Sequence, residues 1–287
     1  MTFKIKGLYI KEYLLPILIL GVYAVLTNMY TTFNVAFLGF QTSETEVGYY
    51  STANKIFAIS LSIFSALTGV LLPRMSSLIS SNKLEEYKVI LSKTTDFLLA
   101  FSLPAIVLVI IFAPELILLI SGKGYEGAIT PLQIMIPLLF IIGYEQILVI
   151  QGLMPLKKDR SILVNSIIGA IVGIVCNLII VPTLKSSGSA IVWLISEMSV
   201  LIVAQMYMRK YVDVSFPWRK VLRNLVYVLP LSFVLLLLKI SPFNYVINLF
   251  FAISLTGLYV FVIQIYLLKT PSIIQVFVQI RDRIMQR

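Results

Sequence analysis

A lysine stands inside an apolar stretch of the chain. Lys55 lies about ten residues into EVGYYSTANKIFAISLSIFSALTGVLLPRMS, residues 46–76, and a lysine in bilayer hydrocarbon costs about 2.5–3.5 kcal/mol. On a helical wheel it shares an arc of about 100° with small and polar residues, namely Ser51, Ala58, Ser62, Ser65, Ala66 and Gly69. Such a stripe faces other helices or water. Lys55, Ser51 and Ser62 are therefore candidates for binding an anionic substrate, unless the Lys55 ammonium simply extends to the nearby membrane surface.

Two carboxylates occupy later apolar stretches. Glu145 and Glu197 lie where a charge is costly and usually functional. Each is a candidate for binding a coupling proton or Na⁺, and each could instead pair with Lys55 or a neighbouring amide. Asn28, in the first apolar stretch, is a further candidate for substrate binding. Amides at this depth more often join helices, at about 0.6 kcal/mol per hydrogen bond.

The sequence offers no set of residues for catalysis. It contains no histidine and a single cysteine, Cys176, which removes the commonest proton carrier and the usual imidazole ligands of a metal site. There is no Ser-His-Asp set and no acidic metal-binding motif, and the loops between apolar stretches are mostly short. We therefore expect a protein that is not an enzyme and that holds no metal or cofactor.

The elements that position these residues are transmembrane helices. The composition is 59% hydrophobic with a mean hydropathy of +0.96, and apolar runs of about 18 residues or more recur along the whole chain. The pattern predicts an all-α integral membrane protein with about eight spans: 13–39, 47–72, 96–120, 128–151, 162–182, 189–208, 221–240 and 244–268.

Positive charge is distributed unevenly between the two sides. Nineteen of the 23 Lys and Arg residues fall in the termini and in the loops after spans 2, 4 and 6, whereas Lys123, Lys185 and Lys239 fall in the opposite loops. The positive-inside rule then predicts that both termini are cytoplasmic. The long first apolar stretch has no clear cleavage site, so we expect it to remain as a helix.

Two amphipathic segments are expected on the cytoplasmic side. Residues 82–93, NKLEEYKVILSK, read as a separate surface helix with Asn82 as N-cap and Glu85 at N3. The tail after Leu268 is basic and amphipathic, which suits it to an anionic inner leaflet.

Several passages carry a more specific signal. EVGYYSTANKI is followed about 20 residues later by LLPRMSSL, and GKGYEGAITPLQIM and NSIIGAIVGIVCNLIIVP come further along. Together they resemble the second half of the Wzx-like polysaccharide flippases, within the multidrug/oligosaccharidyl-lipid/polysaccharide exporter superfamily. TLKSSGSAIVW departs from the Tyr-Gly and Gly-Ala-Ala turn of that family, although Gly188 and Ala190 are small.

The resemblance implies a fold and an activity. Residues 1–208 would form one six-helix lobe of a MATE-like fold, and residues 209–287 would add two accessory helices and the basic tail. Such proteins move isoprenoid-diphosphate-linked oligosaccharides across the bacterial cytoplasmic membrane, between two lobes around a cationic cavity. Lys55 would then hold a diphosphate or an acidic sugar.

The chain is shorter than the members of that family. They have 12 to 14 helices, and this chain has about eight predicted spans. A half or fragment of a transporter, working with a first-lobe partner chain or with a second copy, is therefore the leading interpretation. A cation-coupled drug or solute exporter would rely on Glu145 and Glu197 instead of Lys55. A non-transporting membrane subunit of a polysaccharide synthesis complex is the third alternative. No nucleic-acid partner is expected.

Overall fold

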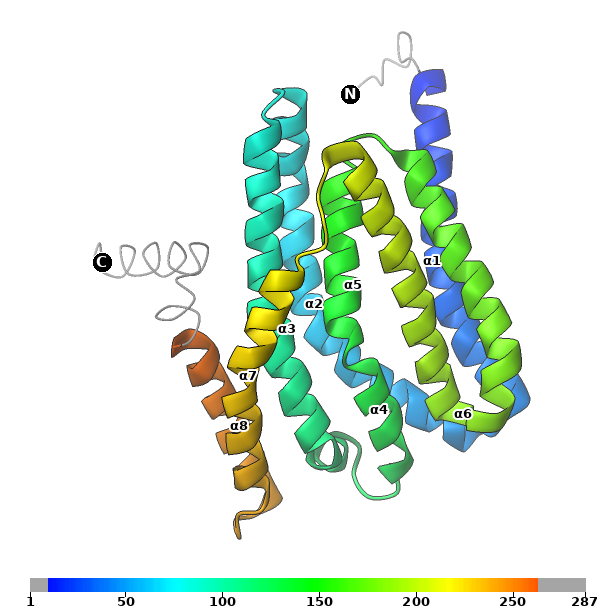
Figure 1. Cartoon of the computed structure of the whole chain (residues 1–287). Helices are drawn as coiled ribbons and strands as arrows, with labels where there is room; N and C mark the ends of the chain where they lie inside the picture. The colour runs from blue at the N-terminus through cyan, green and yellow to red at the C-terminus, as the bar shows by residue number, and fades with distance from the viewer. Residues whose placement is uncertain (1–9, 263–287) are drawn as a thin grey trace, which may run out of the picture.

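The computed structural model describes residues 10–262, and the regular structure in this range is helical (Figure 1). The two segments named η are short: η1 is a 3₁₀ turn and η2 is a π-helix. In chain order the elements are α1 (Ile10–Gln41), α2 (Glu44–Ser80), α3 (Leu84–Ser121), η1 (Glu126–Ala128), α4 (Ile129–Met135), α5 (Leu138–Gln146), η2 (Ile147–Leu153), α6 (Asp159–Val212), α7 (Trp218–Lys239) and α8 (Tyr245–Val262). The predicted basic tail lies outside the described residues.

These helices match the predicted spans. Five of them (α2, α3, α6, α7 and α8) are long and apolar enough to cross a membrane, and the segment from η1 to η2, bent by 40°, makes a sixth. α6 is itself a hairpin, because the chain reverses at Lys185 and the Ser161 and Tyr211 hydroxyls lie 3.0 Å apart. Each limb is about 40 Å long at 1.5 Å per residue. With α1, every predicted span has a helix or a helix limb, so the predicted membrane fold is confirmed.

The turn inside α6 is fixed by close contacts. Lys185 adopts φ 50° and ψ −128°. The Glu46 carboxylate, in the first turn of α2, accepts hydrogen bonds from the Ser186 N–H at 3.2 Å and the Ser186 hydroxyl at 2.5 Å, and lies 3.8 Å from the Lys185 ammonium. A Cβ at Gly188 would lie 3.0 Å from the Ile180 carbonyl oxygen. The glycine therefore permits the turn, and Glu46 attaches it to α2.

Prolines stand at bends in two of the spans. Phe112 leaves helical geometry just before Pro114, and Pro137 stands at the bend between α4 and α5. Pro114 has no N–H to donate to the Ile110 carbonyl. The Gln133 amide from α4 donates to that carbonyl instead, at 2.9 Å. The kink in α3 is therefore satisfied by a neighbouring span.

The predicted surface helix over 82–93 is wrong as a separate element. Residues 84–93 are the first turns of α3, which runs without interruption into the membrane. Asn82 is not an N-cap, because it adopts φ 56° in the connection, and Lys83 precedes the helix without a side-chain cap. Burial explains the continuity: Tyr87 and Leu91 are inside the protein, and the Tyr87 hydroxyl donates to the Gly152 carbonyl at 2.8 Å.

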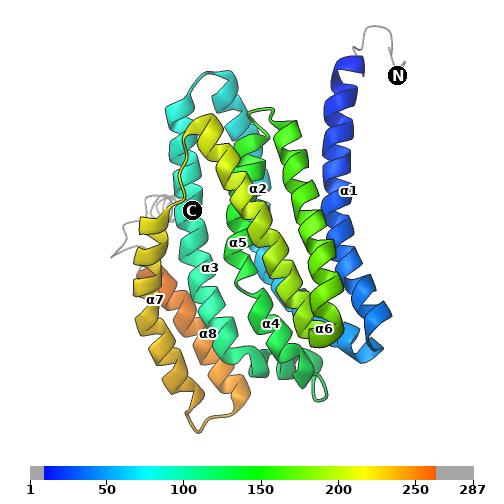
Figure 2. The ribbon, with the colours of Figure 1, turned by 45° about the vertical axis from the view of Figure 1, so that its right-hand side comes forward.

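The helices form a bundle with α1 and α6 on one flank and α7 and α8 on the other (Figure 2). Its core holds the buried rings of Tyr50, Phe57, Phe64 and Tyr144. α7 and α8 contact mainly α3, through small separate clusters around Phe112 and Leu99. The proposed boundary at residue 208 remains a prediction.

Candidate functional site

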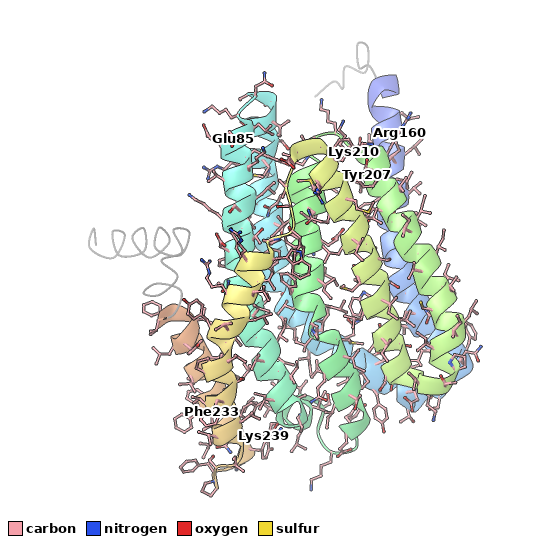
Figure 3. The ribbon with its side chains drawn as sticks, viewed as in Figure 1. Glu85, Arg160, Tyr207, Lys210, Phe233 and Lys239 are labelled. Atoms are coloured by element: carbon pink, nitrogen blue, oxygen red, sulfur yellow. The ribbon has the colours of Figure 1, made fainter. Side chains whose placement is uncertain are left out.

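Charged side chains lie at both ends of the bundle. Figure 3 labels Glu85, Arg160 and Lys210 near one end and Lys239 near the other. We call the first the basic end, where α2 ends, α3 begins and the two limbs of α6 have their outer termini. The opposite end carries the turn at Lys185 and the loop containing Lys123.

The polar stripe of α2 lies on the surface of the bundle. Five of its members are exposed: Lys55, Ala58, Ser62, Ala66 and Gly69. Phe57 and Phe64, on the other face of α2, are buried. Within residues 10–262 no salt bridge involves Lys55. The stripe is thus an open surface of small residues with a cation that has no ion pair in the described part of the chain.

The other predicted substrate-binding residues differ in their surroundings. Ser51 is half-buried, and the exposed Ser62 donates to the Ile59 carbonyl of its own helix at 2.7 Å. Ser65 accepts a hydrogen bond from the Gln146 amide at 3.1 Å, so it joins α2 to α5. Asn28 is in α1, and its side chain lies outside the described part of the structure.

Glu145 and Glu197 meet inside the bundle. Both line a cavity of about 130 Å³ between α1, α5 and the two limbs of α6, together with Tyr23, Gln146 and Asn165. Both carboxylates are buried, and the Trp193 indole N–H donates to Glu197 at 3.1 Å. The pairing with Lys55 that the sequence left open is not seen among the described residues.

Asn165 completes this cavity. Its Oδ1 and Nδ2 atoms are buried without a hydrogen-bond partner among the described residues. A carbonyl oxygen beside two carboxylates is the ligand type that hard cations prefer. Its place in this cavity was missed because the residues come from separate spans, and single-span patterns carry no signal of how spans meet.

The motif residues that carry the resemblance contact one another at the opposite end. The Tyr49 ring is packed over Gly127, where an added Cβ would lie 2.3 Å from ring atom Cε2. Tyr49 also meets Tyr125 edge to face, with centroids 6.3 Å apart. Gly127, Tyr49 and Tyr125 therefore hold α2 against the η1 turn, which is a structural role.

Comparisons with known proteins agree with the sequence resemblance. Residues 3–130 match the family described as "Polysaccharide biosynthesis protein". A "Putative O-antigen transporter" of Escherichia coli (strain K12) is 30% identical over 188 residues, covering 63% of this chain and 44% of the relative. A "Probable low-salt glycan biosynthesis flippase Agl15" of Haloferax volcanii is 22% identical over 198 residues, covering 67% and 40%. The chain resembles polysaccharide flippases and spans less than half the length of these two relatives.

The fold has a solved counterpart. "Lipid II flippase MurJ, inward closed conformation" superposes with a TM-score of 0.71 at 16% identity, over 86% of this chain and 53% of that one. At this identity the likeness establishes the flippase fold alone. The matched part corresponds to about half of the longer protein.

Proposed function

We propose that this chain forms one lobe of a flippase that moves lipid-linked oligosaccharides across the membrane. The flippase fold and the names of two relatives support this function. The observation that carries it is the exposed α2 stripe. A lysine among small residues, with no ion pair to a described residue, is unfavourable against lipid and suits a polar path shared with another lobe.

Lys55 is the proposed contact for the anionic part of the substrate. An ammonium at this depth attracts a diphosphate or an acidic sugar strongly, because the surroundings have a low dielectric constant. Ser51 is proposed to add a hydrogen bond from the same wall, and Asn28 of α1 is proposed as a further substrate-binding residue. A second lobe, from a partner chain, a second copy or a longer polypeptide, would supply the opposite wall.

The proposed location is the bacterial cytoplasmic membrane, with the basic end in the cytoplasm. The positive-inside rule supports this orientation, since the opposite end holds only Lys123, Lys185 and Lys239 among the basic residues of its predicted loops.

The Lys55 contact is tested by surface polysaccharide in cells that depend on this protein. Lys55→Ala should lower export about tenfold or more, the scale of losing a charge-assisted hydrogen bond, while Lys55→Arg keeps part of it. Lys83→Ala, which removes an exposed cation of the basic end, is the matched control and should export normally. Full export by Lys55→Ala at normal abundance would overturn the assignment.

The cavity of Glu145 and Glu197 favours a cation-coupled mechanism as a second feature of the transporter. Two carboxylates in a small buried space repel each other, and a bound proton or Na⁺ between them relieves that repulsion. A drug or solute exporter of the same superfamily would share this dependence but would not require Lys55. The Lys55 variants therefore separate the two substrate classes.

A further inference from the structure

A large hollow lies at the basic end, away from both sites above. It has a volume of about 700 Å³ and is lined by α3, α5, η2, the second limb of α6, residues 214–217 and the first turn of α7. No Asp or Glu is among the described residues of its lining. Four cationic side chains line it: Lys88, Arg209, Arg219 and Lys220.

Only part of this positive charge is balanced. Lys220 pairs with Asp96 at 2.9 Å and donates to the Ser92 hydroxyl at 2.7 Å, so it is used in joining α7 to α3. Lys88 lies 3.5 Å from Glu85, whose carboxylate is 86% exposed. Arg209 and Arg219 have no salt bridge with any residue between 10 and 262.

Two unpaired guanidinium groups favour a phosphate ligand. Arg presents a planar set of donors that matches phosphate oxygens in bidentate geometry. The hydroxyl groups of Ser92 and Ser215 add neutral donors to the same lining, whereas the Thr95 hydroxyl donates to the Leu91 carbonyl. The hollow therefore has the charge and the donors to bind a phosphate monoester, diester or diphosphate.

The surroundings of the hollow indicate that the phosphate belongs to a lipid. Trp218 lines the hollow and begins α7. An exposed apolar strip begins at this residue and follows one face of α7. Its side chains are each 59–65% exposed: Trp218, Leu222, Val226, Leu229 and Phe233. Figure 3 labels Phe233 on the lower part of α7. Acyl chains can cover this strip while the head group stays among the cations, at the level where Trp and basic residues meet a membrane surface.

We propose that this hollow, the α7 head-group pocket, binds the phosphate of an anionic membrane lipid and thereby holds α7 against the lobe. The lipid neutralises Arg209 and Arg219, which come from α6 and α7, and so bridges the two helices. This inference does not depend on the proposed flippase activity. It concerns a resident bilayer lipid, at a place separate from Lys55.

Thermal unfolding of delipidated protein in a neutral detergent tests the pocket. Excess phosphatidylglycerol should raise the midpoint by about 5 °C or more, and phosphatidylcholine or inorganic pyrophosphate should raise it much less. The double variant Arg209→Gln, Arg219→Gln should lose the rise, whereas Arg209→Lys, Arg219→Lys should keep most of it. Arg74→Gln, Lys83→Gln removes two exposed charges of the basic end outside the pocket and should respond like wild type.

Three outcomes would overturn the proposal. Equal stabilisation by phosphatidylcholine would remove the need for an anionic head group, and a full response of the double Gln variant would place the lipid elsewhere. Stabilisation by pyrophosphate without any effect of phosphatidylglycerol would assign the pocket to a soluble anion. If the Gln variant does not fold, native mass spectrometry of the wild type and the Lys variant decides, since both should retain phosphatidylglycerol in preference to phosphatidylcholine.

Discussion

The environment of each charged residue determines what it can do within the membrane. Lys55 is exposed at the surface of α2 without an ion pair to a described residue, whereas Glu145 and Glu197 are enclosed in one cavity. An exposed charge can meet a ligand delivered by another lobe, and enclosed carboxylates can exchange only a small cation or a proton. The two sets of residues therefore suit substrate contact and coupling, respectively.

Removing the carboxylate charges should separate coupling from folding. Glu197→Gln keeps an oxygen that can accept the Trp193 hydrogen bond, so the fold should persist. We expect Glu145→Gln and Glu197→Gln each to reduce gradient-driven export about tenfold or more at normal abundance, because the cation loses a charged ligand. Export measured while the Na⁺ and proton gradients are collapsed one at a time identifies the cation.

The control for this prediction is Glu86→Gln, which removes a carboxylate from the surface of the basic end. It should leave export unchanged. Unaltered, gradient-dependent export by both cavity variants would show that these carboxylates are structural.

The sequence could indicate which residues were unusual but not which of them meet. Lys55, Glu145 and Glu197 each stand out because a charge in an apolar span is costly. The cavity depends on a juxtaposition of α1, α5 and both limbs of α6, and the α7 head-group pocket on a juxtaposition of α3, α5, η2, the second limb of α6 and the start of α7. Neither arrangement can be recognised from local periodicity. The sequence therefore places Arg209 and Arg219 only in a basic loop.

At the scale of helices, the spans were predictable because hydropathy is a local property. The continuity of α3 through residues 84–93 was not, because it depends on Tyr87 bonding to the distant Gly152 carbonyl. The π-helix at Ile147–Leu153 was also not predicted. It follows directly after Gln146, whose amide joins α5 to Ser65 of α2.

The contact between Gly127 and Tyr49 should be sensitive to a single methyl group. In Gly127→Ala the new Cβ would lie 2.3 Å from the Tyr49 ring, so the ring must move away from η1. We expect a loss of about 1–3 kcal/mol, measured as a lower midpoint of thermal unfolding in detergent. Gly257→Ala, where no atom lies within 4 Å of the added Cβ, is the control, and equal midpoints for the two variants would contradict this packing role.

At the scale of the whole molecule, the bundle has one face whose chemistry does not suit lipid. The surfaces of α6 and α7 expose large apolar side chains such as Ile179 and Phe233. The stripe of α2 instead exposes Ala58, Ser62 and Gly69 beside Lys55. Small residues allow helices to approach closely, and contact in a bilayer is driven by such packing and by polar groups. This face is therefore the one we expect a second lobe to cover.

The proposed orientation can be measured independently. Cysteines replacing Lys123 and Lys83, each in a Cys176→Ser background, place an accessible thiol at the opposite end and the basic end. An impermeant thiol reagent added to intact cells should label the first and not the second. The reverse pattern would place the basic end outside.

The central claim is that the α2 stripe lines a path between two lobes. Photo-crosslinking from this stripe tests the claim most directly. A photoreactive side chain at Ser62 should capture a protein segment of a transport lobe, and illumination should stop polysaccharide export in the same cells. The same group at Ile179, which is 68% exposed on α6, should capture mainly lipid and leave export intact. Capture of lipid alone from Ser62, with export undiminished, would contradict the account.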